Sequence, residues 1–380
     1  MADIERQVAA AIDPDEVGRR RQLQRDLWAG KRLDHMPFFL TVSEPAPRYT
    51  TRELLQDGEK QRRNAFAAAL LSYRSVPGGD WVPAVRPDVG CSCLATAFGA
   101  ELYWGENPEQ TCGVREPVIT DLSSVDRLEV PPADAGVLGD GTRRVRRFAE
   151  TGRGLVAVSL LDMAGGPNVA LDLLGAERLY TAMVEEGEAL ELLLDRIQRL
   201  FLSAIEMQIA AAGGEDLIAT TDFPDTWFPE GRKGHLSDDV SANIAPALYR
   251  RFSIPFHDRV FRRYGGGGLH NCGPNPCLEE YLRHSPAPRS VDLSHRFSAG
   301  DLPRIKRVFR RRAFVYLGDF NVPARDLPGL YRGLARAMAP EVIVVAQFGV
   351  TTRDDPQELH RRLLEVSREY AAAVDWGWED

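Results

Sequence analysis

The chain has 380 residues, 44% of them hydrophobic and 27% charged, as is ordinary for a globular protein with a large core. Its formal net charge is −8 at pH 7, which argues against nucleic acid as a partner, because phosphate binding requires a basic face. The N-terminal segment has no signal-peptide pattern, and no apolar run approaches the ~20 residues of a membrane span. We therefore expect a cytoplasmic protein without membrane or nucleic-acid partners, whose five cysteines are thiols or metal ligands.

Eight short apolar segments follow one another along the chain and predict β-strands. Most are continuously apolar, which is typical of strands buried on both faces in a parallel sheet. The predicted strands are Phe38–Val42, Trp81–Val85, Leu155–Leu160, Leu217–Asp222, Gly267–Cys272, Ser290–Ser294, Phe314–Asp319 and Val342–Gln347. Helical patterns separate most of them, at Glu53–Ser72, Ala176–Ala211, Ala247–Tyr264, Asp301–Arg311, Leu327–Met338 and Gln357–Ala373. This alternation predicts an α/β fold, the (β/α)8 TIM barrel, because right-handed crossovers close such a sheet into a ring.

The organisation along the chain predicts a single domain over residues 1–380. No repeat, low-complexity tract or Pro/Ser linker marks a boundary. Residues 1–36 predict a helical extension before the first strand. The long interval 86–154 predicts loops and an extra hairpin over the barrel mouth.

In such a barrel, chemistry belongs at the carboxyl ends of the strands, where the βα loops gather. These ends carry many carboxylates, metal-capable side chains and a few cations, which favours an active site. The candidates, in chain order, are Glu44, Arg48 and Tyr49; Arg86, Asp88, Cys91 and Cys93; Asp162; Asp222, Asp225 and Trp227; His270, Asn271 and Cys272; Asp292 and His295; Asp319 and Asn321; and Gln347.

The segment GGGGLHNCGPNPC (residues 265–277) contains the most specific pattern. His270 and Cys272 are two residues apart in a strand, so their side chains point to the same face. An imidazole and a thiolate that converge at a strand end are two donors that zinc prefers. Cys277 is a candidate third ligand, and Cys91, Cys93, Asp238 and Asp239 are alternatives. The competing interpretation is a core histidine beside an inert cysteine.

Three stretches resemble the uroporphyrinogen decarboxylase superfamily: LWAGKRLDHMPFF (residues 27–39), the segment 245–272 that ends in GGGGLHNC, and the tail SVDLS…VYLGDFNVPA…VIVVAQFGV. This superfamily contains decarboxylases and zinc-dependent, corrinoid-linked methyltransferases. The resemblance extends over nearly the whole chain in order, so it implies one barrel, often paired into a homodimer.

Two departures from the family pattern bear on function. The methyltransferase branch has His-x-Cys on strand 5, matched by His270 and Cys272, and a further cysteine near the end of strand 8. This chain has Gln347-Phe348-Gly349 there, so a third ligand must come from elsewhere. The decarboxylase branch has an arginine-rich segment after strand 1, of which at most Arg48-Tyr49 remains. Decarboxylation of uroporphyrinogen itself is therefore not expected.

Three functions follow as hypotheses. The first is zinc-dependent methyl transfer to a small thiol or related nucleophile. The chain has no cobalamin-binding Asp-x-His-x-x-Gly segment, so a corrinoid donor would be carried by a partner protein. Asp319 or Asp222 would position or deprotonate the incoming group. The second is a lyase that decarboxylates a small carboxylic acid, and the third is a non-catalytic binding barrel.

The lyase hypothesis assigns roles to further residues. Arg48 and Arg86 would grip the carboxylate, and Tyr49, His270 or Asp319 would reprotonate carbon. For either reaction, we expect the substrate to contact residues at the barrel mouth, namely Arg48, Arg86, Glu44, Trp227, Asn321 and Gln347.

Overall fold

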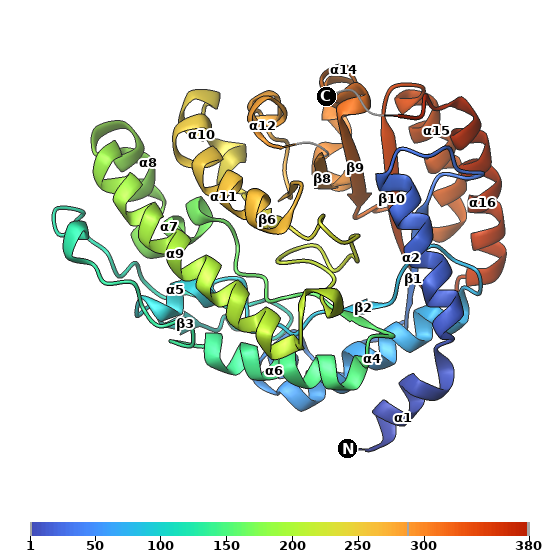
Figure 1. Cartoon of the computed structure of the whole chain (residues 1–380), viewed down its shortest axis with the longest axis horizontal. Coiled ribbons are helices and arrows are strands. Elements are labelled where there is room, and N and C mark those ends of the chain that lie inside the picture. Colours follow the sequence, from blue (N-terminus) through green and yellow to red (C-terminus); the bar gives the residue numbers. More distant parts are fainter. Residues whose placement is uncertain (1, 287–288, 378–380) are drawn as a thin grey trace.

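The computed structural model describes residues 2–286 and 289–377 of the chain. Its centre is a parallel sheet with strand order β1-β10-β9-β8-β7-β6, ringed by helices (Figure 1). The strands are β1 (Phe38–Ser43), β6 (His235–Ser237), β7 (Gly268–Asn271), β8 (Arg289–Ser294), β9 (Ala313–Gly318) and β10 (Ile343–Thr351). A second parallel pair consists of β2 (Ala84–Val85) and β5 (Ala157–Val158).

Backbone hydrogen bonds continue the ring from β5 to β6. The Ala219 amide donates to the Val158 carbonyl at 2.8 Å, and the Thr221 amide donates to the Lys233 carbonyl at 3.1 Å. Between β1 and β2, the Asp80 carboxylate accepts the Phe38 amide at 3.1 Å. The fold is therefore the predicted TIM barrel. Between β1 and β2, the Asp80 side chain provides the link between the two strands.

The helices pack their apolar faces against the outer faces of the strands. The longer ones are α4 (Gly58–Ser75), α6 (Leu138–Gly152), α8 (Ala176–Glu185), α9 (Gly187–Ala212), α11 (Ile254–Tyr264), α15 (Leu327–Met338) and α16 (Pro356–Ala373). The shorter ones are α3 (Thr51–Gln56), α5 (Cys93–Ala97), α7 (Gly166–Leu174), α10 (Pro246–Phe252), α12 (Leu278–His284), α13 (His295–Ser298) and α14 (Leu302–Phe309). None of these helices, nor any other in the described part of the chain, is long and apolar enough to cross a membrane.

The N-terminal extension is helical, as predicted, and consists of α1 (Ala2–Ala11) and α2 (Pro14–Trp28). Helix α2 begins where the Asp13 carboxylate accepts the Asp15 amide, with proline at the first helical position. At its other end, Trp28 donates from Nε1 to the Tyr316 hydroxyl at 3.0 Å and packs on Phe314 with ring centroids 4.7 Å apart. Because Phe314 begins β9, the extension covers the amino end of the barrel.

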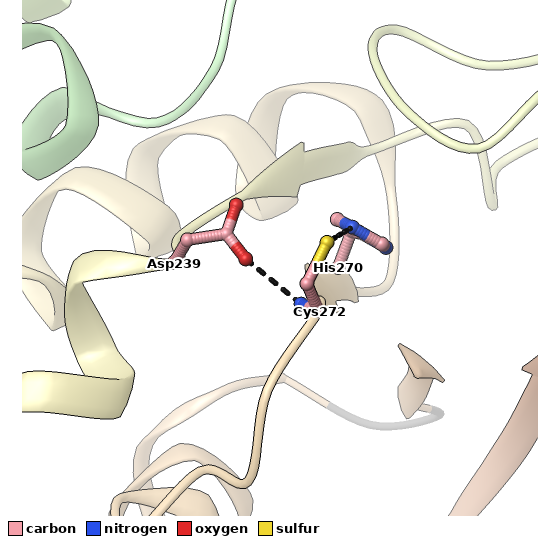
Figure 2. Close-up of side chains that lie close together, drawn as sticks. All are labelled: Asp239, His270 and Cys272. Carbon is pink, nitrogen blue, oxygen red and sulfur yellow. Dashed lines mark hydrogen bonds between the residues drawn. The ribbon is translucent and has the colours of Figure 1, made fainter. Parts of the chain in front are cut away.

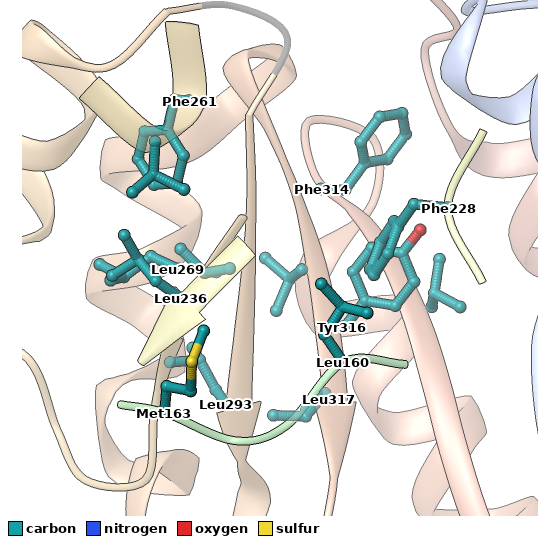
Figure 3. Packing of buried hydrophobic residues seen from close by; sticks show 14 of the residues in the cluster. Leu160, Met163, Phe228, Leu236, Phe261, Leu269, Leu293, Phe314, Tyr316 and Leu317 are labelled. Atoms are coloured by element: carbon teal, nitrogen blue, oxygen red, sulfur yellow. The ribbon is translucent and has the colours of Figure 1, made fainter. Parts of the chain in front are cut away.

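Leucine side chains from neighbouring strands lie together in the buried core. Leu236 of β6, Leu269 of β7 and Leu293 of β8 lie on neighbouring strands and are almost completely buried (Figure 3). Such close packing on both strand faces explains why the predicted strands are continuously apolar.

Two parts of the chain differ in detail from the prediction. The predicted strand Leu217–Asp222 begins as a 3-10 turn (Glu215–Leu217), and only Ile218 forms a regular bridge to β5. The next strand, β6, was not predicted, because HLS is a short run inside a polar, glycine-rich segment. The extra hairpin is present as the antiparallel pair β3 (Leu102–Tyr103) and β4 (Gly113–Val114).

Candidate active site

A cavity of about 1080 Å³ lies at the carboxyl ends of the barrel strands. This volume is ample for a drug-sized small molecule. Of the residues proposed above for catalysis, substrate binding or metal binding, seven line it: Arg86, Cys91, Asp239, His270, Cys272, Asp319 and Gln347. Asp162, Asp225 and Asp292, also predicted at strand ends, line it as well.

Three potential metal ligands meet on one side of this cavity (Figure 2). One ligand atom each from Asp239, His270 and Cys272 lies within 4.8 Å of the other two. His270 and Cys272 share a face at the end of β7, and Asp239 follows the neighbouring strand β6, whose Ser237 pairs with His270. The Cys272 amide donates to Asp239 Oδ1 at 2.8 Å, which holds the carboxylate beside the thiol.

A chain of hydrogen bonds orients the imidazole. His270 Nδ1 lies 2.7 Å from Asp292 Oδ1, and Gln347 Nε2 donates to Asp292 Oδ2 at 2.7 Å. His270 Nε2 therefore faces Cys272 Sγ, at 3.3 Å. Burial alone would lower the pKa of His270, but its hydrogen bonds to Asp292 and Cys272 outweigh burial and raise the pKa to about 10. A carboxylate behind a histidine is the usual support of a metal-binding imidazole.

The loop after Asp222 turns into the barrel interior. Its first residue, Phe223, packs on His270 with ring centroids 4.1 Å apart, and Thr226 Oγ1 donates to Gln347 Oε1 at 3.4 Å. Further along, Phe228 packs edge-on against Trp28 at the amino end of the barrel. The loop thus lines the cavity with its first residues, whereas Phe228 packs in the core at the amino end of the barrel.

Arg86, directly after β2, forms an ion pair with the half-exposed Asp225. Its Nε lies 3.1 Å from Asp225 Oδ1, and its guanidinium stacks 4.9 Å from the centroid of the Phe223 ring. Burial by itself lowers the pKa of Arg86, but the surrounding carboxylates, Asp225 foremost, raise it. Carboxylates thus surround this arginine, but its Nε and Nη1 are buried without a hydrogen-bond partner among the described residues.

Asp222 is buried at a structural junction outside the residues that line the cavity. Its two carboxylate oxygens accept the amides of Met163 and Ser237, at 2.9 and 3.2 Å. These contacts join the segment after β5 to the end of β6. Burial raises the pKa of Asp222 well above its ordinary value.

Cys277 lies behind the three-ligand group. Its Sγ is buried and donates to the carbonyls of Ser241 and Ile244, at 3.6 and 3.5 Å. Burial raises the pKa of this thiol to about 12, so it remains protonated at neutral pH. Cys91 lines the cavity elsewhere, and the Sγ of buried Cys93 donates to the Asp162 carbonyl at 3.3 Å.

Five other predicted contacts fall outside the cavity lining. Glu44, Arg48 and Asn321 are exposed, and Tyr49 is covered by the Arg48 guanidinium, 5.2 Å from its ring centroid. Trp227 belongs to a small apolar cluster with Ala84, Ala157 and Ala219, where Arg25 and Lys233 stack on its ring. Since Arg25 belongs to α2, Trp227 lies toward the amino end of the barrel.

A buried network supports the segment that carries Asp239. Asp238 Oδ2 lies 3.1 Å from His257 Nε2, and His257 Nδ1 lies 3.2 Å from the Tyr249 hydroxyl. The Asn271 amide group donates to the Asp238 carbonyl at 3.1 Å, which ties this segment to β7. Sequence reasoning missed the role of His257, because it sits within an ordinary amphipathic helical pattern.

The fold and this site define a TIM-barrel protein with a potential Asp/His/Cys metal centre at the carboxyl end of the barrel. The family model of uroporphyrinogen decarboxylase (URO-D) matches residues 26–299, which is more than half of the chain. The chain therefore belongs to the uroporphyrinogen decarboxylase family, as the sequence resemblance predicted.

A methyltransferase from Methanosarcina mazei has a similar structure, with a TM-score of 0.65. The match covers 92% of this chain and 98% of that chain at 16% sequence identity, and it confirms the fold. No curated protein sequence matches the chain.

Proposed function

We propose that this chain is a zinc-dependent methyltransferase that methylates a small thiol, with a methylated corrinoid on a separate protein as donor. The observation that carries the proposal is the convergence of Asp239, His270 and Cys272 at the cavity wall. Family membership limits the field to the reactions of this barrel family, and the solved methyltransferase fold is compatible with methyl transfer.

The donor set fits zinc. Nitrogen, sulfur and carboxylate oxygen are its ordinary ligands, and three protein ligands with one open position are typical of catalytic zinc. Asp239 would take the place of the thiol that the family's methyltransferases have near the end of strand 8. Gln347, which lies within β10 in the corresponding stretch, instead hydrogen-bonds to Asp292 behind His270. Zinc bound here would lower the pKa of a coordinated substrate thiol toward neutral pH.

The protein's own groups would prepare the reactants. Asp292 keeps the Nε2 of His270 directed at the ligand group, and Phe223 shields the imidazole from solvent. Asp319 lines the cavity, and its carboxylate is fixed by the Ser294 hydroxyl at 2.6 Å, so it can accept the proton of the thiol. Asp222, whose two oxygens are bound by backbone amides, is not assigned this role.

The overall transfer is balanced as follows. The thiol releases its proton, and a sulfur lone pair forms the new sulfur–carbon bond. The methyl group would come from the separate corrinoid donor, which would keep the two electrons of the broken bond. The products are a methyl thioether, the demethylated corrinoid and one proton.

Metal content of the purified protein tests the site. We expect about one zinc per chain in the wild type and loss of zinc in Cys272→Ala and Asp239→Asn. Cys277→Ala is the matched control, because Cys277 is a neighbouring buried thiol outside the ligand group. Absence of zinc from the wild type after incubation with the metal would end the proposal, and loss in Cys277→Ala alone would move the third ligand there. The reaction is then assayed with methylcobalamin and small thiols.

The geometry gives weaker support to decarboxylation. That reaction needs a cation for the substrate carboxylate. Arg48 lies exposed outside the cavity lining, so only Arg86 could serve, with Nη1 buried there without a hydrogen-bond partner among the described residues and Nε 3.1 Å from Asp225. A binding protein without catalysis would have no need for an oriented Asp/His/Cys group. Methyl transfer is therefore the function that the site supports best.

A further inference from the structure

Asp239 lies at a position where a carboxylate usually has another task. It immediately precedes the short 3-10 helix η3 (Val240–Asn243). An aspartate at the start of a helical turn commonly turns back and accepts one of the free backbone amides of that turn. The Asp239 side chain makes no such bond. Its Oδ1 accepts the Cys272 amide at 2.8 Å instead, which directs the carboxylate toward the other proposed metal ligands (Figure 2).

Other side chains accept the amides at the start of η3. The Val240 amide donates to Oδ1 of Asn168, on α7, at 3.0 Å. The Ser241 amide donates to Asp238 Oδ1 at 3.1 Å. Val240 and Ser241 are almost completely buried, so water does not readily replace a lost partner there. The first two amides of η3 are thus satisfied without the Asp239 carboxylate.

The two acceptors come from different parts of the barrel. Asp238 belongs to the same segment as Asp239, and its other oxygen lies 3.1 Å from His257 Nε2 in the buried network described above. Asn168 reaches η3 from α7, the helix that follows β5, and it is half-buried in the cavity lining. The hydrogen bond from Val240 to Asn168 therefore joins the segment of the third ligand to a separate helix.

A glycine before α7 permits this reach. Gly165 directly precedes the first residue of α7 and lies against the carbonyl oxygen of Ser237, the last residue of β6. The approach is so close that a methyl group at position 165 would overlap this oxygen. Because Ser237 lies only three residues before Val240, the close approach holds Asn168 within hydrogen-bond distance of the Val240 amide.

Loss of the Asn168 acceptor would leave a buried amide beside a mobile acceptor. An unpaired buried amide is costly, and aspartate side chains readily bond to amides near them in the chain. The Asp239 carboxylate would turn from the Cys272 amide toward the start of η3. It would then no longer face His270 and Cys272.

We propose that Asn168 is a positioning residue for the metal centre: it accepts the Val240 amide and so leaves the Asp239 carboxylate free to act as the third ligand. Asn168 acts through Asp239 and needs no contact with metal or substrate. The inference rests on the proposed zinc site and adds a residue outside the ligand group on which that site depends.

Two measurements test this role: zinc affinity by competition with a chromophoric chelator, and hydrogen exchange of the Cys272 amide in the metal-free protein by NMR. Asn168→Leu removes the acceptor at similar volume. We expect it to bind zinc about tenfold more weakly, as for other residues behind metal ligands. Exchange of the Cys272 amide should rise toward the rate in Asp239→Ala. Asn168→Asp keeps the acceptor oxygen and should retain at least the wild-type zinc affinity and the slow exchange.

Two further variants separate this role from a general effect on the fold. Asn243→Leu replaces an exposed asparagine of the same cavity lining and is the matched control, which should change neither measurement. Gly165→Ala leaves Asn168 in place but pushes the start of α7 away from β6. It should weaken zinc binding and speed up exchange of the Cys272 amide in the same direction as Asn168→Leu, so the test does not depend on one variant. Circular dichroism confirms that each protein is folded.

The outcomes separate this inference from the proposed function. A folded Asn168→Leu protein with unchanged zinc affinity and unchanged exchange would overturn the role of Asn168 and leave the zinc site intact. Weaker zinc binding with unchanged exchange of the Cys272 amide would overturn it as well, because the effect would not pass through Asp239. If the wild type binds no zinc, the proposed function fails, and exchange in the metal-free variants still decides whether Asn168 holds the Asp239 carboxylate in place.

Discussion

Asp292→Asn tests the hydrogen-bonded support of the proposed metal ligand His270. Asp292 contacts His270 Nδ1 and receives Gln347 Nε2, both at 2.7 Å, and it is almost completely buried. Asparagine keeps the shape of the side chain but removes its charge, and its amide group opposes the donor from Gln347. Loss of such a carboxylate partner weakens metal affinity by about 10–100-fold, or about 1.4–2.8 kcal/mol.

The assay is zinc competition against a chromophoric chelator, with circular dichroism to confirm folding. Gln347→Met should have a smaller effect, because it leaves the Asp292–His270 contact in place. Asp134→Asn, outside the cavity, should have none. A folded Asp292→Asn protein that binds zinc as tightly as the wild type would refute the role given to this carboxylate and would place the metal, if any, elsewhere.

Three further predictions concern stability. Trp28→Ala should lower the free energy of unfolding, measured by urea denaturation, by about 3–5 kcal/mol, because a buried aromatic side chain at the amino end of the barrel is lost. A change below about 1 kcal/mol would contradict this packing. Burial lowers the pKa of Lys233 to about 7, so between about pH 7 and 10.5 the unfolded chain binds one proton more than the folded chain. Stability of the wild type relative to Lys233→Met should therefore rise with pH across this window, and a flat difference would mean that Lys233 stays charged. His257→Ala should cost about 1–3 kcal/mol in thermal or urea unfolding, because buried Asp238 loses its partner, whereas unchanged stability would show the pair to be dispensable.

Much of the architecture could be predicted from the sequence. A strand buried on both faces must be apolar throughout, so segments such as the one that forms β9 are recognisable without their neighbours. The family resemblance placed these strands in one barrel, and the family match confirms it. The segment that became β6 was missed because its register depends on Thr221 and β7 rather than on its own composition.

The site could be predicted only in part. His270 lies in β7 and Cys272 directly follows this strand, so the alternation of side chains is enough to bring them together. The sequence left several candidates open for the third ligand, and distance along the chain favoured Cys277. The structure brings Asp239 to the group instead, because β6 lies directly beside β7.

Sequence reasoning also placed side chains in the cavity that lie elsewhere. Trp227 follows a strand end, but its loop turns into the barrel and carries it toward α2.

The sequence alone determined the class of fold, the family and the His-x-Cys pair, because each depends on local periodicity or on residues close in the chain. Only the tertiary structure decided which acid joins that pair and that Arg86 lies beside Asp225 in the cavity lining. Those facts depend on which strands and loops become neighbours in space, and that is set by the packing of the whole barrel.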